Sequence, residues 1–159
     1  MPVSQDDFRQ VLGRFATGVT IITLKSGREI HGLTVNSFAS VSLDPPLILI
    51  CIQKNVSSHT FFSDGAGFVV NILSRDQQEW SNRFANSELS GPERFQGVDY
   101  RETDSGIPIL DGNLGHLECK VANRIQAGDH TIFIGEVIHA ETASANPPLL
   151  FYESQYLDG

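Results

Sequence analysis

A run of small polar residues after a strand-like segment is the part of this sequence best suited to hold a ligand. Residues 32–40 read Gly-Leu-Thr-Val-Asn-Ser-Phe-Ala-Ser. Thr34, Asn36, Ser37 and Ser40 offer several neutral hydrogen-bond donors and acceptors within a short span. A flat heterocycle with alternating carbonyls and ring nitrogens needs such a surface. The alternative interpretation is an ordinary strand end whose hydroxyl groups are solvated.

A second candidate, for an anion, lies at residues 54–59, which run from a strand end into an expected short helix starting at a serine. The serine hydroxyls, the first free amides and the helix dipole can together receive a phosphate group. Lys54 adds a point charge beside them. The same residues also fit a plain helix N-cap. Further candidates for this anion, on the next expected helix, are Ser81, Asn82 and Arg83.

The spacing of histidine and cysteine residues argues against a metal or hydrolase site. No pair of the five histidines has the His-x-x-x-His spacing, and no Cys-x-x-Cys occurs. His116 and Cys119 stand three apart on an expected strand, so their side chains face opposite sides. A Gly-x-Ser-x-Gly elbow is also absent. His130 follows an expected hairpin turn, where its imidazole can hydrogen-bond a ligand or simply the backbone.

The elements that would position these residues are mostly strands. Strands are expected over residues 19–24, 29–35, 47–52, 67–73, 114–125, 131–140 and 149–152. The 47–52 run is apolar throughout, which predicts a strand buried on both faces. Asp44-Pro45-Pro46 is expected to stop a ladder, because neither proline donates a backbone hydrogen bond.

Helices are few in this prediction. Residues 4–16 are expected to form an amphipathic helix with Ser4 as N-cap, since apolar residues recur at i, i+3, i+4 and i+7 from Phe8. A second helix is expected over 74–85, and residues 86–106 are expected to be a long surface connection. The hairpin-like spacing, without β-α-β alternation or a Rossmann glycine fingerprint, favours a mainly β fold, an antiparallel β-barrel with a few helices.

Composition bounds the class of protein. A chain of 159 residues, 40% hydrophobic, fits one domain with a proper core. Its net charge of −8 argues against a nucleic-acid surface, and no apolar run approaches the roughly 20 residues that a membrane helix needs. We expect no secretory signal and a cytoplasmic protein. Cys51 and Cys119 lie in apolar runs, where buried free thiols are favoured over a disulfide.

Four motifs in order resemble the flavin reductase family, the small reductases that partner two-component flavin-dependent monooxygenases. Gly-x-Thr-x-Asn-Ser-Phe at 32–38, followed by a Ser-x-x-Pro-Pro-like segment, is similar to the flavin-binding motif of that family. The other matches are Phe-Ala-Thr-Gly-Val-Thr at 15–20, Gly-Asp-His at 128–130 and Pro-Leu-Leu-Phe-Tyr at 148–152. The resemblance covers about residues 4–156 and implies that residues 1–159 form a single flavin reductase-like domain.

The resemblance implies an FMN-binding split barrel that holds flavin at a homodimer interface. The residues it assigns to FMN or FAD are Leu33, Thr34, Val35, Asn36, Ser37, Ala39, Ser40, Cys51, Ile52, Gln53, Ser57, Ser58 and Ser81. Those it places near the nicotinamide are His130, Phe151, Tyr152 and Tyr156. The chain departs from the family at Glu153-Ser154-Gln155, where an arginine and glycines are often found, which weakens the case for a strong dinucleotide anchor there.

The implied activity is hydride transfer from NADH, or NADPH, to FMN or FAD, with the reduced flavin passing to a separate monooxygenase. Stacking nicotinamide on the flavin ring does most of this work, so no essential nucleophile is predicted. One alternative is a non-catalytic flavin carrier on the same barrel. Another is an FMN-dependent oxidase of the pyridoxamine-phosphate type, which the acidic balance disfavours. A ligand-free interaction module would leave the polar residues at 34–40 unexplained.

Overall fold

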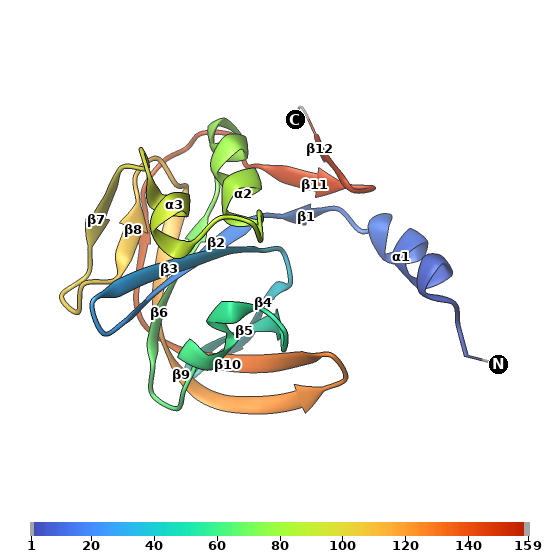
Figure 1. Cartoon of the computed structure of the whole chain (residues 1–159), viewed down its shortest axis with the longest axis horizontal. Coiled ribbons are helices and arrows are strands. Elements are labelled where there is room, and N and C mark those ends of the chain that lie inside the picture. Colours follow the sequence, from blue (N-terminus) through green and yellow to red (C-terminus); the bar gives the residue numbers. More distant parts are fainter. Residues whose placement is uncertain (1, 158–159) are drawn as a thin grey trace.

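The computed structural model describes residues 2–157, and its centre is one strongly curled antiparallel sheet (Figure 1). The strand order is β3-β2-β6-β9-β10-β5-β4. Their bounds are β2 Thr20–Ser26, β3 Glu29–Val35, β4 Phe38–Leu43, β5 Pro46–Gln53, β6 Gly67–Ile72, β9 Gly115–Ala127 and β10 His130–Thr142. The mainly β prediction is confirmed. The barrel, however, is an open sheet, because no ladder in the described residues joins β3 to β4.

Side-chain alternation along the strands builds two large hydrophobic clusters, one on each face of the sheet, beside a small third cluster of Val69, Ile107 and Ile109. Ile22 and Leu24 of β2 enter the cluster inside the curl, and Ile21 enters the cluster beneath the helices. On β5, Ile48 and Ile50 are buried while the intervening residues are only half-buried. The prediction that this strand is buried on both faces is therefore wrong for the single chain.

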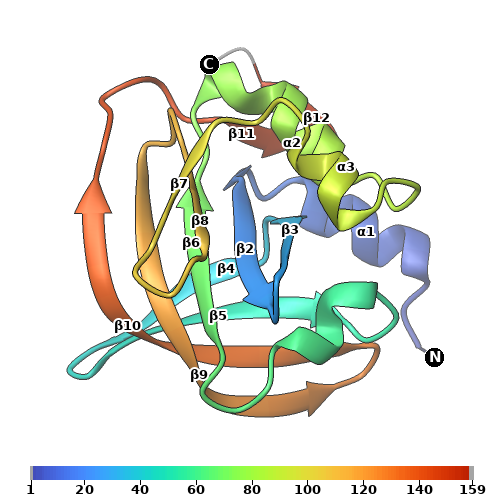
Figure 2. The ribbon, with the colours of Figure 1, turned by 60° about the vertical axis from the view of Figure 1, so that its left-hand side comes forward.

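The remaining elements lie around the sheet (Figure 2). The helices are α1 Gln5–Gly13, α2 Gln78–Phe84 and α3 Gly91–Phe95, with 3-10 helices η1 Ser57–Phe61 and η2 Arg75–Gln77. The short strands are β1 Thr17–Gly18, β7 Tyr100–Glu102, β8 Pro108–Leu110, β11 Leu150–Tyr152 and β12 Gln155–Leu157. Among the described residues there is no helix with the length and apolar content to span a bilayer.

Three local expectations need correction. The segment at 86–106 is not a bare connection, because it contains α3 and β7. The Asp-Pro-Pro sequence does not simply end a strand: Leu43 pairs with Pro46 across a tight turn, and Pro46 opens β5. The element at residue 57 is a five-residue 3-10 helix with Val56 as N-cap, and no side chain caps it. Its serines therefore do not form the capped α-helix start that the anion hypothesis assumed.

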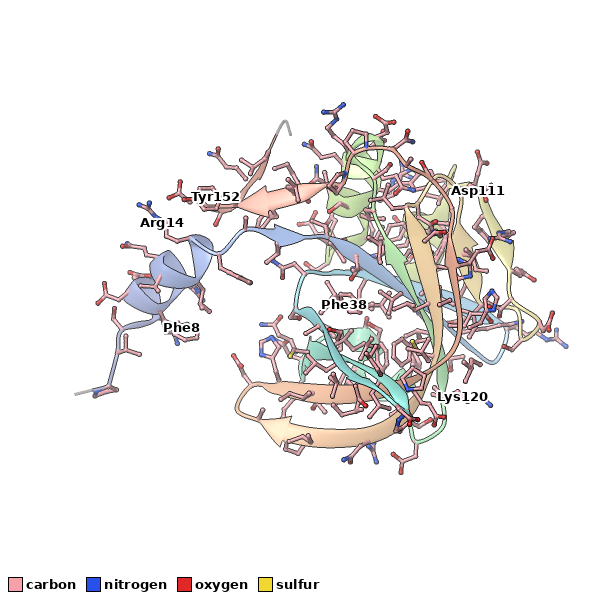
Figure 3. The ribbon with its side chains drawn as sticks, turned by 180° about the vertical axis from the view of Figure 1, so that it is seen from behind. Phe8, Arg14, Phe38, Asp111, Lys120 and Tyr152 are labelled. Atoms are coloured by element: carbon pink, nitrogen blue, oxygen red, sulfur yellow. The ribbon has the colours of Figure 1, made fainter. Side chains whose placement is uncertain are left out.

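Helix α1 projects from the rest of the molecule, as Figures 1 and 3 show. Ser4 caps it as expected, accepting a hydrogen bond from the amide of Asp7 at 3.1 Å. None of its residues is buried. At its far end, Arg14 Nε lies 2.7 Å from Glu153 Oε1, which ties the helix to the β11–β12 turn. The apolar stripe of α1 is thus held in place but left uncovered in the single chain.

His31 of β3 is largely buried, and the Glu29 carboxylate, 3.6 Å from its Nε2, is too far for a hydrogen bond. Its ring stacks on Phe61 with centroids 4.1 Å apart, and its Nε2 has no hydrogen-bond partner. Burial lowers the pKa of His31 below its ordinary value of 6.5; Glu29 partly opposes this, and Arg94 adds to it. The folded chain therefore disfavours the protonated imidazole.

Acid is consequently expected to destabilise the fold through His31. Below about pH 6.5 the unfolded chain binds a proton at this site that the folded chain does not, so the free energy of unfolding falls as pH falls towards the lowered folded-state pKa. His31→Phe keeps an aromatic ring on Phe61 and removes the proton site. Its free energy of unfolding, from urea titrations between about pH 7 and about pH 5, should decline less than that of the parent. Equal slopes would contradict this account.

Candidate functional site

A pocket of about 190 Å³ lies where the ends of β3 and β5 meet the start of β10. Its lining residues are Leu33, Thr34, Val35, Asn36, Ser37, Cys51, Ile52, Gln53, Val56 and His130. Residues 36–37 connect β3 to β4, the two edge strands of the sheet. The pocket therefore lies at the gap where the sheet stays open.

The edge of β3 supplies the pocket with backbone groups. Arg94 Nη1 donates to Gly32 O at 2.7 Å, so the polar backbone groups of Gly32 point away from β2. Residues two apart on a strand share this direction, which turns the N–H and C=O of Thr34 outward as well. Helix α3 packs against β3, and its Arg94 occupies the carbonyl of Gly32. The outward groups of Thr34 face the pocket instead. A ligand there meets one free amide donor and one free carbonyl acceptor.

Ser37 fixes the backbone where the chain crosses from one edge to the other. Its carbonyl accepts from Cys51 N at 3.2 Å, and its Oγ donates to Cys51 O at 3.0 Å. Phe38, labelled in Figure 3, then begins β4. The side chain of Asn36 is exposed and makes no hydrogen bond to another described residue. Asn36 thus presents its side-chain amide to the pocket. The β3–β4 connection that carries it is fixed by the hydrogen bonds between Ser37 and Cys51.

His130 is oriented by the residue before it. It pairs with Gln53 across the β5–β10 ladder, and its Nδ1 lies 2.7 Å from Asp129 Oδ1. The hydrogen bond from His130, followed by the charge of that ring and of Lys54, lowers the pKa of Asp129. Because the carboxylate accepts the proton on Nδ1, Nε2 is the ring nitrogen left to contact a ligand.

Neither cysteine is activated as a nucleophile. Cys51 and Cys119 are free thiols, as the sequence predicted. Burial raises the pKa of the Cys51 thiol, although a hydrogen bond with Ser37 opposes it, and burial raises the pKa of Cys119 to about 12. Near neutral pH the sulfur that lines the pocket is a neutral thiol, which contributes polarizable contact surface.

The structure brings nine of the predicted site residues together in the pocket: Leu33, Thr34, Val35, Asn36, Ser37, Cys51, Ile52, Gln53 and His130. Others lie outside its lining. Ala39 and Ser40 are exposed on β4, while Ser57 is exposed and Ser58 buried on η1. Phe151 and Tyr152 belong to β11, which pairs with β1. Val56 was missed, although an apolar residue directly after the 53–55 turn was a signal that could have found it.

Ser81 and Tyr156 lie beside β3 and outside the pocket lining. Ser81 is fully buried, and its Oγ lies 2.6 Å from Tyr156 Oη. Thr34 Oγ1 donates to Ser81 O at 2.6 Å. The predicted phosphate contact of Ser81 does not fit this arrangement, because its hydroxyl is already engaged and shielded. Instead, the carbonyl of Ser81 fixes the side chain of Thr34, whose backbone faces the pocket.

These groups suit one edge of a flavin ring. The pocket offers uncharged donors and acceptors in a row, which match the alternating carbonyls and nitrogens of the isoalloxazine. Ligand pockets that enclose a whole small molecule measure about 300–1,000 Å³, so about 190 Å³ encloses only part of a flavin nucleotide. A flavin nucleotide whose ring edge lay in this pocket would therefore extend beyond it.

The chain thus folds as an open curled sheet with a neutral polar pocket between its two edge strands. The chain belongs to the family of the flavin reductase like domain, which matches residues 12–159.

Individual relatives agree with this assignment. The chain is 43% identical over 140 residues to the FMN reductase (NADH) SmoA of Agrobacterium fabrum, covering 88% of this chain and 78% of that one. It is 40% identical over 149 residues to HsaB of Rhodococcus jostii, the reductase subunit of a flavin-dependent monooxygenase, covering 94% and 75%. The structure of the Streptomyces globisporus NADH:FAD oxidoreductase with NAD and FAD fragments superimposes with a TM-score of 0.88 at 36% identity, covering 100% of this chain and 96% of that one.

Proposed function

We propose that this protein is a flavin reductase that transfers hydride from NADH, or NADPH, to FMN or FAD. The observation that carries the proposal is the row of neutral polar groups at the gap of the open sheet, in a chain of the flavin reductase family. Bound flavin would supply N5 as the hydride acceptor. The protein would then need to orient two rings and to stabilise the reduced ring, which is work for fixed dipoles.

Residue roles follow from the positions described above. Asn36, Ser37 and the backbone of Thr34 would bind the polar edge of the flavin, and Ser81 and Tyr156 would hold Thr34 in position. His130 Nε2 would contact the nicotinamide carboxamide while Asp129 holds Nδ1. The remaining proposed contacts are Ala39, Ser40, Ser57 and Ser58 for the rest of the flavin nucleotide, and Phe151, Tyr152 and Tyr156 for the nicotinamide end.

A homodimer would complete this site. The supporting observations are the small share of a flavin that one pocket encloses, the half-buried outer face of β5, and the exposed apolar stripe of α1. On α1, Phe8 is 54% exposed and Val11 71% exposed. A second copy that covers these surfaces would bury apolar area and wall the pocket. Light scattering should then give twice the mass of one chain; a monomer at micromolar concentration would contradict the proposal.

The biological setting is proposed on the same basis. Residues 1–159 would act as one domain, and the reduced flavin would leave for a separate flavin-dependent monooxygenase, as the name of HsaB indicates for that relative. The two free thiols suit a reducing compartment, which supports the cytoplasm as the place of action.

The direct test is oxidation of NADH by the purified protein without oxygen, with FMN, FAD or riboflavin added in turn. Nicotinamide and flavin absorbance are followed together. Joint bleaching that scales with the added flavin is the expected result, and the fastest flavin identifies the preferred substrate. Flavin binding without NADH oxidation would favour a carrier, and absence of flavin binding would overturn the site assignment.

Asn36→Ala is expected to weaken flavin binding by up to about tenfold, because one hydrogen bond is worth about 0.5–1.5 kcal/mol. Turnover at saturating flavin should persist, since the side chain is not a nucleophile. Flavin affinity is measured by fluorescence quenching, alongside the rate of NADH oxidation. Asn146→Ala, at an exposed loop position outside the pocket, serves as the matched control. If Asn36→Ala binds and reduces flavin as the parent does, Asn36 does not belong to the site.

A further inference from the structure

A second group of chemically active side chains lies at the other end of the β9–β10 ladder. His116 of β9 is paired with Glu141 of β10, and His139 stands two residues before Glu141 on the same strand. One ligand atom from each of these three residues lies within 4.8 Å of the others. A register shift between Val137 and His139 sets this arrangement, because it places His139 opposite Glu118.

His116 is unusual among the polar residues of the core. Its side chain is 1% exposed, and neither of its ring nitrogens has a hydrogen-bond partner. Glu118 Oε2 lies 3.9 Å from Nε2, which is too long for a hydrogen bond. A buried imidazole without partners costs free energy unless something else satisfies it. Burial, with the charge of Arg101, lowers the pKa of His116, although Glu141 and Glu118 oppose this.

Both positively and negatively charged side chains surround the cluster. Arg101 of β7 lies 3.6 Å from Glu141 Oε1, and His139 Nε2 lies 3.5 Å from Glu141 Oε2. Glu102 and Asp104 line the same cavity, whose volume is about 390 Å³. Arg101 is 55% exposed, so its guanidinium can leave the carboxylate at small cost when another cation takes its place.

We propose that His116, His139 and Glu141 form a binding site for a divalent transition-metal ion, with Zn²⁺ as the best match. Two imidazoles and one carboxylate are the ligand set that zinc favours when one position is left open. Zinc bonds of about 2.0–2.1 Å need ligand atoms about 3.4 Å apart. His139 and Glu141 are half-exposed and can rotate inward, and water would take the fourth position.

The metal would act on the fold and not on hydride transfer. His139 lies nine residues beyond the pocket residue His130 on β10, which corresponds to about 30 Å along the strand. The ion would join β9 to β10 at the register shift and would give the buried ring of His116 its missing partner. An ion that binds only the folded chain stabilises it by mass action.

The test is calorimetric titration of zinc chloride into tag-free protein that has been stripped with a chelator. One zinc ion per chain is expected. His139→Ala and Glu141→Gln change half-exposed side chains, so the fold should survive, and each should weaken zinc binding by about tenfold or more. Arg101→Gln should tighten zinc binding about two- to fivefold, because it removes the cation that competes for Glu141.

Glu102→Gln is the matched control, since Glu102 lines the same cavity but lies outside the cluster. It should bind zinc as the parent does. The proposal is overturned if the parent binds neither Zn²⁺, Co²⁺ nor Ni²⁺ at submillimolar concentration, or if His139→Ala and Glu141→Gln both retain the affinity of the parent. Neither outcome bears on flavin reduction, which is assayed separately in the same preparations.

Discussion

Replacing Ser37 by Trp is expected to weaken flavin binding by about a hundredfold or more. Ser37 lines the pocket at the connection between the two sheet edges, and its side chain is exposed in the single chain. An indole there would occupy the space that the ring edge needs, since the pocket measures only about 190 Å³. Overpacking of this kind costs about 3 kcal/mol, which corresponds to the expected factor.

Flavin fluorescence quenching measures the affinity of this variant, and anaerobic NADH oxidation measures its activity. Ser87→Trp is the matched control, because Ser87 is an exposed loop serine outside the pocket lining. Far-ultraviolet circular dichroism shows that both variants fold. Parent-like flavin affinity in folded Ser37→Trp would mean that the ligand binds elsewhere on the protein.

Asn71→Leu is expected to lower the free energy of unfolding by about 3 kcal/mol. Asn71 is fully buried on β6. Its amide nitrogen donates to Ile21 O at 2.9 Å and to Thr23 Oγ1 at 3.1 Å. Its amide oxygen accepts from Leu110 N at 2.9 Å and from Asn113 Nδ2 at 3.2 Å. Leucine has a similar size but leaves these groups buried and unpaired, which costs more than the bonds themselves are worth.

Urea denaturation followed by tryptophan fluorescence gives this free energy, provided that the slope against urea is unchanged. Asn146→Leu, in an exposed loop, is the matched control and should shift the midpoint little. A loss below about 1 kcal/mol for Asn71→Leu would show that water replaces the missing amide, and that this side chain does not join β6 to β2 and β8.

Strand positions were predictable where the pattern was local. The strand at Glu29–Val35 was predicted with its exact bounds, because a turn precedes it and the polar segment follows it at once. The pocket residues at 33–37 and 51–53 were also predicted, from the resemblance to the flavin reductase family, and each set is continuous in the chain at the end of a strand. Val56 was not, because its place in the pocket depends on the turn that precedes η1.

Contacts between distant residues could not be predicted from one sequence. Ser81 and Tyr156 are 75 positions apart, and only the tertiary fold shows that their hydroxyls bind each other. The cluster at His116 and Glu141 also depends on a contact between distant residues. Spacing rules for metal sites compare only neighbours on one element, so they do not detect it. A register shift between two long strands leaves no mark in the spacing of either strand. Whether a curled sheet closes is likewise decided by the two strands at its ends.

The outer edges of β3 and β4, which no ladder joins in the described residues, also have a kinetic consequence. In the single chain the gap between these edges already opens the pocket to solvent, so no strand has to separate for a molecule to enter or leave. Its residence time should therefore depend on the number of contacts it makes, without a gating step in its dissociation. For a ligand that must be passed to another protein, a pocket without a closing element favours rapid exchange over tight retention.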